Sequence, residues 1–376
     1  MASQRLLGYD HANRDHTQGA FVMPLRHTFL SACAALGATL LALVAMWLFG
    51  PSALRAAPAP QEAGCAAASC VYIPMISRPV RIQQLGAIRT GVTALDVLGD
   101  RVYYDGDGTL RIADISDPAA PAEVGTLIGD RQAITEIHAV GARLYTKSEF
   151  RLSACCISTT LGLWDIGQPD VASQIGALPT YQVNRIAVDG SHLYAISLFW
   201  AGPQSPELAT YVISDSGYLK SGEAKSGGGY SVAASAGYAY VGAADGVDIF
   251  DISDSAHPQL VATIPVTESI VALDAKRLYV VNDSGLSIWD VSSPAAPAKL
   301  GELAGIPRAA DVFAQARRLY LAQSAAGISL IDVADPAAPQ LLARYDTPGT
   351  ANIIRVSGDR IVVADGDGGL RILRAE

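Results

Sequence analysis

Two Asp-Gly-Asp-Gly stretches contain the residues of this sequence that most resemble a metal site. The first stretch provides Asp105 and Asp107, and the second provides Asp365 and Asp367. Alternating carboxylates are typical of calcium loops, because Ca²⁺ binds several oxygen ligands at once. Both stretches lack the glycine that such loops need at their sixth position, so we expect them to act first as turns. Calcium is the one cofactor that the sequence suggests.

Four cysteines form a second group with chemistry of its own. They occur as two close pairs, Cys65 with Cys70 and Cys155 with Cys156. The fifth cysteine, Cys33, lies in the apolar N-terminal stretch described below. The exported part therefore keeps an even number of cysteines, which indicates disulfides. We favour pairing within each close pair, while pairing across the two groups and a redox-active pair remain alternatives.

Motifs of the common enzyme classes are absent from the sequence. It has no Gly-x-Ser-x-Gly turn, no His-Glu-x-x-His motif and no phosphate-binding glycine loop. His138, His192 and His257 fall at unrelated places in the repeat described below, which argues against a zinc cluster. The sequence therefore leans towards a protein that is not an enzyme.

The N-terminal part of the chain is typical of an export signal. Residues 29–50 are an uncharged apolar stretch, and small residues that suit a signal peptidase follow near Ala56 and Ala57. Arginines precede the stretch and keep that end in the cytoplasm. We expect residues 1–56 to be a signal peptide or a membrane anchor and 57–80 a linker. The rest is then extracellular or at the cell surface, with membrane contact only through the N-terminal segment.

The charge of the chain restricts its partners. The formal net charge is −9 at pH 7, and an acidic surface repels nucleic acid and anionic lipid. Half of the residues are hydrophobic, and 35 glycines and 20 prolines accompany them. This composition predicts a folded core with many turns.

A repeat organises the sequence from residue 81 onward. A short segment with tyrosine at its fifth position, such as "GDRVYY" or "AKRLYV", recurs at intervals of 39 to 49 residues. The seven marker positions are Tyr103, Tyr145, Tyr194, Tyr240, Tyr279, Tyr320 and Val362. Each unit reads as four short strands separated by Gly, Asp and Pro turns. The length of a unit and its four strands are both typical of a propeller blade.

The two ends of the repeat region complement each other. The seventh unit stops after its third strand, and residues 81–90 have the form of the missing fourth strand. We therefore predict that residues 81–376 form an all-β, seven-bladed propeller, closed when residues 81–90 complete blade 7.

The third strand and its turn also indicate a family. Segments such as "LRIADISDPAAP" and "ISLIDVADPAAP" resemble the LVIVD repeat of exported bacterial and archaeal proteins. The resemblance implies a propeller and an exported location. It implies no catalytic residues.

Two units depart from the repeat between their second and third strands. Unit 2 carries Phe150 and Arg151 in an expanded turn, and unit 3 carries Phe199, Trp200 and Pro203 in another. Because units 2 and 3 are neighbours, we expect one raised lip that contacts a partner. Folding of these residues back onto the blades is the alternative.

These observations lead to one functional hypothesis and a rival. We expect a binding or scaffolding module for a protein or glycan of the cell envelope. The rival is an extracellular hydrolase or lyase with its site in the central funnel, and a funnel cluster of His, Arg and carboxylates with shifted pKa values would favour it. In the closed ring, units 7 and 1 are adjacent, so the four aspartates of the two stretches meet at one seam.

Overall fold

A computed structural model describes residues 79–376 of the protein, apart from 128–132, 154–155, 169, 198–207 and 227–228. The chain divides into two units, 1–76 and Ser77–Glu376. The described residues belong to the second unit, so the expected export segment lies outside them. No helix among the described residues is long and apolar enough to span a membrane.

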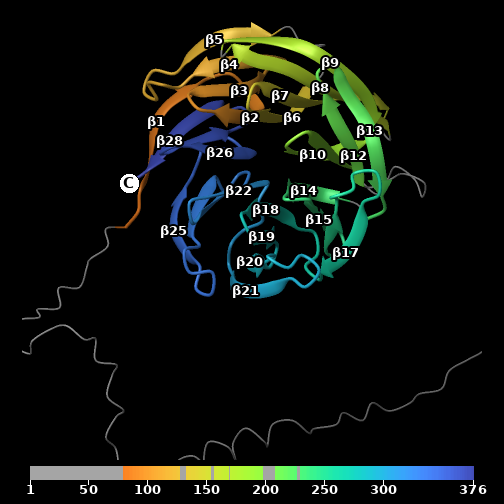
Figure 1. The fold of residues 1–376 in the computed structure, drawn as a ribbon. Coiled ribbons are helices and arrows are strands. Elements are labelled where there is room, and N and C mark those ends of the chain that lie inside the picture. Colours follow the sequence, from red (N-terminus) through yellow and green to blue (C-terminus); the bar gives the residue numbers. More distant parts are fainter. Residues whose placement is uncertain (1–78, 128–132, 154–155, 169, 198–207, 227–228) are drawn as a thin grey trace, which may run out of the picture. The chain divides into compact units, whose positions relative to one another are not determined.

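The elements of the described residues are β-strands, which form seven four-stranded antiparallel sheets arranged in a ring (Figure 1). In order from the axis outward, blade 1 contains β2 (Val92–Leu98), β3 (Arg101–Gly106), β4 (Thr109–Asp114) and β5 (Ala122–Leu127). Blade 2 contains β6 (Ala133–Val140), β7 (Arg143–Ser153), β8 (Cys156–Gln168) and β9 (Val171–Tyr181). Blade 3 contains β10 (Val183–Asp189), β11 (His192–Ser197), β12 (Leu208–Ser214) and β13 (Gly217–Ala224).

The remaining four blades follow the same order. Blade 4 contains β14 (Gly229–Ser235), β15 (Tyr238–Ala243), β16 (Val247–Asp251) and β17 (Gln259–Ile264). Blade 5 contains β18 (Ile270–Asp274), β19 (Arg277–Asn282), β20 (Gly285–Asp290) and β21 (Ala298–Leu303). Blade 6 contains β22 (Asp311–Gln315), β23 (Arg318–Ala322), β24 (Ile328–Asp332) and β25 (Gln340–Tyr345). Blade 7 contains β26 (Ile353–Ser357), β27 (Arg360–Ala364), β28 (Leu370–Ala375) and β1 (Ile82–Ile88).

The hydrophobic core lies between the blades. Seven clusters of buried side chains each join two neighbouring blades. The repeated tyrosines belong to these clusters and are at most 7% exposed, so they pack between blades. Burial raises the pKa of Tyr194 and of Tyr240 to about 12, so their hydroxyl groups stay protonated.

The aspartate that ends the third strand caps the turn after it. Asp114 Oδ1 accepts a hydrogen bond from the Ser116 backbone N–H at 2.7 Å. The same bond recurs at Asp165, Asp251, Asp290 and Asp332. Hydrogen bonds from Ser116 hold the pKa of Asp114 below its ordinary value. The repeated aspartates therefore have the structural role that Asp takes in such turns.

The fourth strand of each blade packs against the turn of the next blade. A bulge interrupts its pairing with the third strand in all seven blades, and glycine follows the bulge in five of them. A Cβ atom added to Gly301 would lie 2.2 Å from Pro336 O of blade 6. One added to Gly86 would lie 2.2 Å from Pro118 O of blade 1. No side chain fits at either close approach.

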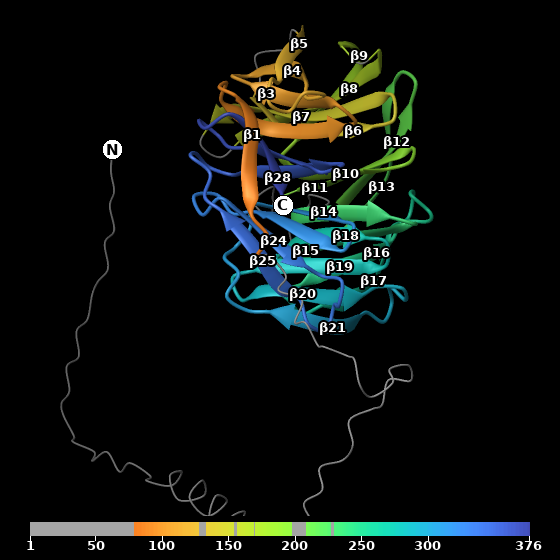
Figure 2. The ribbon, with the colours of Figure 1, turned by 90° about the vertical axis from the view of Figure 1, so that its left-hand side faces the viewer.

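β1 closes the ring as predicted. It pairs with β28 from Ile82 opposite Ala375 to Ile88 opposite Leu370 (Figure 2). Near the axis, Val92 of blade 1 exchanges two backbone hydrogen bonds with Gly366 of blade 7. An equivalent pair of bonds joins blades 6 and 7. The seam between the two ends of the chain is therefore built like an internal one.

Comparing the seam between blades 7 and 1 with an internal seam tests whether β1 closes the ring. We expect Gly86→Ala to lower the free energy of unfolding by about 1–3 kcal/mol, because the new methyl group must displace the blade 1 turn. Gly301→Ala at the equivalent internal seam is the matched variant and should cost about the same. Chemical denaturation measures both. A loss with Gly301→Ala but none with Gly86→Ala would show that β1 does not seal the ring.

Candidate functional site

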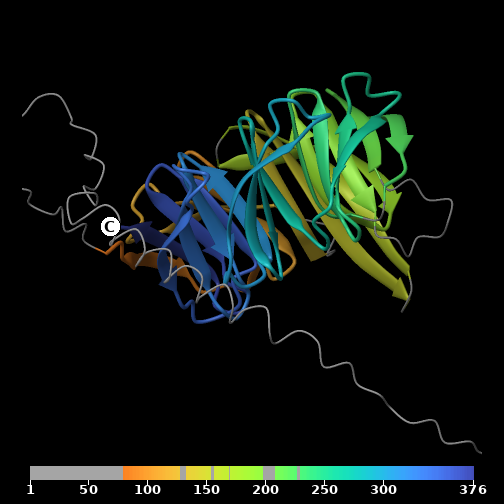
Figure 3. The same cartoon turned by 90° about the horizontal axis from the view of Figure 1, so that it is seen from below.

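Blade 2 extends beyond the regular ring at its hairpin end. β7, β8 and β9 have 11, 13 and 11 residues, whereas the other strands have five to eight. β6 pairs with β7 only as far as Glu149, but β7 continues along β8 to Ser153. Figure 3 shows these long strands, yellow to olive, reaching past their neighbours. We call residues 150–158 the blade 2 tip; the expected expanded turn is thus mostly strand.

A buried lysine anchors the base of the tip. Lys147 is 1% exposed, and its Nζ donates to Glu149 Oε1 at 2.7 Å and to the Asn184 carbonyl of blade 3 at 2.8 Å. Thr135 of β6 also donates to Glu149 Oε1, at 3.1 Å. Lysine is almost never fully buried without a partner. This network ties the base of the tip to β6 and to the neighbouring blade.

The expected lip falls only partly within the described residues. Phe150 begins the tip and its side chain is 52% exposed, so it does not fold back onto the blade. Arg151 follows it on β7. Phe199, Trp200 and Pro203 lie outside the described residues, and their part in a lip stays a prediction.

The cysteines also fall mostly outside the described residues. Cys65, Cys70 and Cys155 lie outside the described residues, and Cys156 is placed only as the first residue of β8. Their pairing stays a prediction.

The two Asp-Gly-Asp-Gly stretches form hairpins of different shapes. Asp107 and Gly108 have φ angles of 55° and 77° and make a two-residue turn between β3 and β4, the type that Asp-Gly favours. The second stretch forms a wider turn between β27 and β28. The turns are neighbours, because Val92 at the start of blade 1 bridges to Gly366 of the second stretch. The predicted seam between blades 7 and 1 therefore exists.

Each stretch has a buried aspartate at this seam. Asp105 Oδ2 accepts a hydrogen bond from Thr93 Oγ1 at 2.8 Å, and burial raises its pKa. Asp365 Oδ2 accepts one from Gly349 N at 2.9 Å and lies 3.4 Å from Arg371 Nε. In both residues the described structure provides no hydrogen-bond partner for Oδ1.

These aspartates do not form a ready metal site. Within the described part of the chain, no group of three or more His, Cys, Asp and Glu side chains is placed to hold a metal ion. Asp105 and Asp365 bond instead to protein groups of their own blades. A calcium site shared by the two stretches therefore has no clustered ligand set among the described residues to support it. Isothermal titration with calcium tests it, and the absence of both heat and a thermal shift would rule it out.

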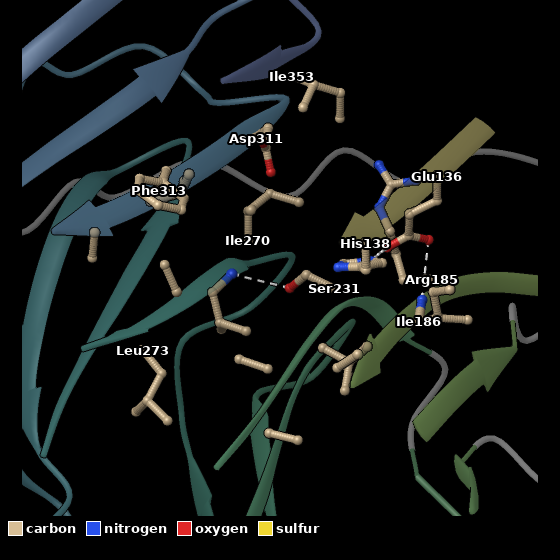
Figure 4. Close-up of a pocket in the computed structure, with 18 of the residues that line it drawn as sticks. Glu136, His138, Arg185, Ile186, Ser231, Ile270, Leu273, Asp311, Phe313 and Ile353 are labelled. Atoms are coloured by element: carbon tan, nitrogen blue, oxygen red, sulfur yellow. Dashed lines mark hydrogen bonds and ion pairs between the residues drawn. The ribbon is translucent and has the colours of Figure 1, made fainter. Parts of the chain in front are cut away.

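A cavity of about 470 Å³ lies on the axis of the ring. The first strands of all seven blades line it in two rows. One row, opposite the repeated tyrosine position, contains Asp96, His138, Ala187, Ala233, Ala272, Phe313 and Arg355. The other row, two residues earlier, contains Glu136, Arg185, Ser231, Ile270, Asp311 and Ile353. Figure 4 shows part of both rows.

Four polar side chains of these rows join neighbouring blades. Asp96 Oδ2 accepts a hydrogen bond from the Ala139 backbone N–H at 2.7 Å. Glu136, Ser231 and Asp311 accept equivalent bonds, each at 3.0 Å, from the first strand of the next blade. Each of these polar groups thus has a structural partner in the protein.

Arg355 lies between two of these carboxylates. Its Nη1 is 2.5 Å from Asp311 Oδ2 and its Nε is 3.3 Å from Asp96 Oδ1. Its guanidinium also lies over the Phe313 ring, 5.8 Å from the centroid. Burial alone would lower the pKa of Arg355, but the charges of Asp311 and Asp96 raise it above its ordinary value. Arg355 is therefore a fixed cation that joins blades 6, 7 and 1.

Glu136, His138 and Arg185 lie together on the walls formed by blades 2 and 3 (Figure 4). Burial opposes ionisation of Glu136, but the His138 hydrogen bond and the charges of His138 and Arg185 hold its pKa below the ordinary value. The Glu136 Oε1 to His138 Nε2 distance is 3.0 Å. The Arg185 side chain forms no hydrogen bond or ion pair with any other described residue. A general acid or base needs a pKa near the working pH, and Glu136 is shifted away from it.

Most residues of this cavity carry no motif that marks them in the sequence. The three histidines do fall at different blade positions, as expected, but His138 pairs with Tyr145 in the register just as Asp96 pairs with Tyr103. Aligning the units on their tyrosines and reading the opposite position would have found the row. Arg185 sits two residues before that position.

The sequence profile of the LVIVD repeat matches residues 93–128, 226–265, 271–303, 308–347 and 348–373. These segments are blades 1, 4, 5, 6 and 7. The chain is an LVIVD-repeat β-propeller. No match covers blades 2 and 3 of this LVIVD-repeat propeller. These are the two units in which the sequence has expanded turns between the second and third strands.

Other comparisons of the LVIVD-repeat propeller extend to the fold alone. No curated protein matches the chain. A computationally designed protein, Ika8, superposes with a TM-score of 0.55 at 13% identity, over 77% of this chain and 98% of its own. A chain of a Mitotic Checkpoint Complex superposes with a TM-score of 0.58 at 11% identity, over 82% of this chain and 99% of its own.

The buried lysine gives a stability test in this LVIVD-repeat propeller. We expect Lys147→Ala to lower the free energy of unfolding by about 2–4 kcal/mol, because the Asn184 carbonyl loses its buried partner. Lys299→Ala is the matched control, since Lys299 pairs with Glu302 on the surface, and it should change stability little. Equilibrium denaturation measures both. Equal effects would contradict the anchoring role of Lys147.

Replacing Asp105 should raise the stability of the protein, in contrast to replacing Lys147. A raised pKa means that the folded state holds the proton more tightly, so the ionised carboxylate costs stability above its folded pKa. That cost develops as the pH rises above the ordinary value of 3.8 and is absent below it. We expect Asp105→Asn to be more stable than the parent at neutral pH, with the difference vanishing in acid. Thermal melts across this pH range would contradict it if the variant were less stable at neutral pH.

Proposed function

We propose that this LVIVD-repeat propeller is an exported binding module whose blade 2 tip contacts a protein or glycan of the cell envelope. The observation that carries the proposal is the extension of one blade beyond a regular ring, with an exposed Phe150 at its start. Exposed aromatic residues on an irregular element are typical anchors of binding surfaces.

The construction of the tip supports this role. β7 and β8 pair from Phe150 opposite Ser158 to Ser153 opposite Cys156, with one register shift between Arg151 and Ser153. The Lys147 network holds the base of the tip to blade 3. A binding residue on a rigid hairpin loses little conformational entropy when a partner binds. Phe150 is therefore well placed to contribute affinity.

The axial cluster supports binding more than catalysis. It contains His, Arg and carboxylates, as the rival enzyme hypothesis required. However, its carboxylates bond to neighbouring blades, and the pKa shifts of Glu136 and Arg355 keep both groups charged. Fixed charges that hold blades together are poorly suited to move protons in a reaction.

Export is the part of the proposal that depends on residues 1–56. Its support is the apolar stretch at 29–50 and the small residues after it. N-terminal sequencing of the protein recovered from the producing cells tests it. A chain that stays in the cytoplasm with its first residues intact would contradict export.

Removing the tip tests the binding role. Glu149 and Thr159 are paired across β7 and β8, so replacing residues 150–158 with Asn-Gly should close a two-residue hairpin and leave the ring folded. We expect this variant, and Phe150→Ser, to retain about tenfold less of the envelope protein or glycan captured by residues 57–376. Affinity capture followed by mass spectrometry and glycan arrays measures retention.

The control variant, like Phe150→Ser, replaces one exposed apolar side chain with serine. Leu219 on β13 is 70% exposed and lies away from the tip, so Leu219→Ser should leave capture unchanged. Capture that survives loss of the tip, or that falls equally with Leu219→Ser, would rule out the tip as the contact surface.

A further inference from the structure

We propose that the axial cavity binds a small molecule in which a carboxylate is joined to an apolar body, and that Arg185 holds the carboxylate. This ligand site is separate from the blade 2 tip and does not depend on the proposed binding role. The cavity, of about 470 Å³, is within the size range of small-molecule pockets, roughly 300–1,000 Å³.

The walls of the cavity differ from one side to the other. Blades 2 and 3 contribute the charged group of Glu136, His138 and Arg185, whereas blades 4 and 5 contribute small and aliphatic side chains such as Ile270 and Leu273. Figure 4 shows these two kinds of wall on different sides of the cavity. Such a pocket fits a ligand that has one charged end and an apolar body.

Arg185 is the group with unused bonding capacity. A guanidinium has five N–H donors in a planar fork that matches a carboxylate. The Arg185 guanidinium donates to no other described residue, and the interaction between Arg185 and Glu136 is one of charge alone. Arg355, in contrast, already has two carboxylate partners. Arg185 is therefore the cation that remains for a ligand.

A cationic ligand fits the cavity less well. Both oxygens of Glu136 are bonded, one to His138 and one to the Ile186 N–H. Asp96 and Asp311 each accept a backbone N–H and pair with Arg355. A cation would have to displace these bonds between blades. A doubly charged anion such as phosphate would also meet three nearby carboxylates, which favours a single carboxylate.

Binding of matched probes to the full propeller tests the proposal. The probes are 3-phenylpropionate, its alcohol analogue 3-phenylpropanol, its amine analogue 3-phenylpropylamine, and glucuronate as a carboxylate with a polar body. We expect isothermal titration to show saturable binding of 3-phenylpropionate alone. Arg185→Gln should weaken it by about tenfold or more, because a charged hydrogen-bond pair is lost.

Two further variants make the result specific. Arg185→Lys keeps the charge without the fork and should bind between the parent and Arg185→Gln. Arg318→Gln removes an exposed arginine of β23, outside the cavity, and should bind as the parent does. Circular dichroism and thermal melts confirm that each variant is folded.

Each outcome either supports or overturns the proposed site. Binding of 3-phenylpropionate that falls with Arg185→Gln and not with Arg318→Gln supports the site. The proposal is overturned if 3-phenylpropionate does not bind, if the alcohol or the amine binds equally well, or if Arg185→Gln binds like the parent. Binding of glucuronate in place of 3-phenylpropionate would overturn the apolar half of the site.

Discussion

Contact between neighbouring blades is the interaction on which the rest of this structure depends. A four-stranded sheet has two faces, and each blade covers both only by packing against the blades on either side. The seven apolar clusters lie at these contacts, and the glycine after the bulge lets the turn of the next blade approach closely. A ring built this way is stable only when its last contact matches the others. β1 satisfies that condition, because it carries the same bulge and the same close approach as the internal fourth strands.

The same constraint explains the polar groups on the axis. The first strands converge there, and Asp96, Glu136 and Asp311 accept backbone N–H groups that would otherwise lack a partner. A cluster of charges at the centre of a propeller therefore need not be catalytic. Here the carboxylates are already bonded within the fold, and Arg185 is the charged side chain of the described cavity that the ring leaves without such a bond.

Blades 2 and 3 are the irregular part of the ring. The LVIVD profile matches the other five blades, and the long strands of blade 2 project from the ring. A buried lysine anchors the base of this projection, at a position where most blades have apolar side chains. Arg185 on β10 also belongs to this part of the ring. Both proposed functional surfaces thus involve the two blades in which the repeat pattern is weakest, as expected where function is added to a regular scaffold.

The amino-acid sequence by itself determined the blade number, the strand order and the closing strand. These depend on local patterns: a tyrosine that returns about every 42 residues, a capping aspartate such as Asp114, and strand alternation. The tertiary structure alone decided that the unit 2 expansion is strand, and that Glu136, His138 and Arg185 face one cavity with Arg355. Arg355 follows Arg185 by 170 residues in the sequence, and no local pattern joins them. They share a cavity only because seven blades close into a ring, and which charges stay unpaired depends on side-chain contacts between blades.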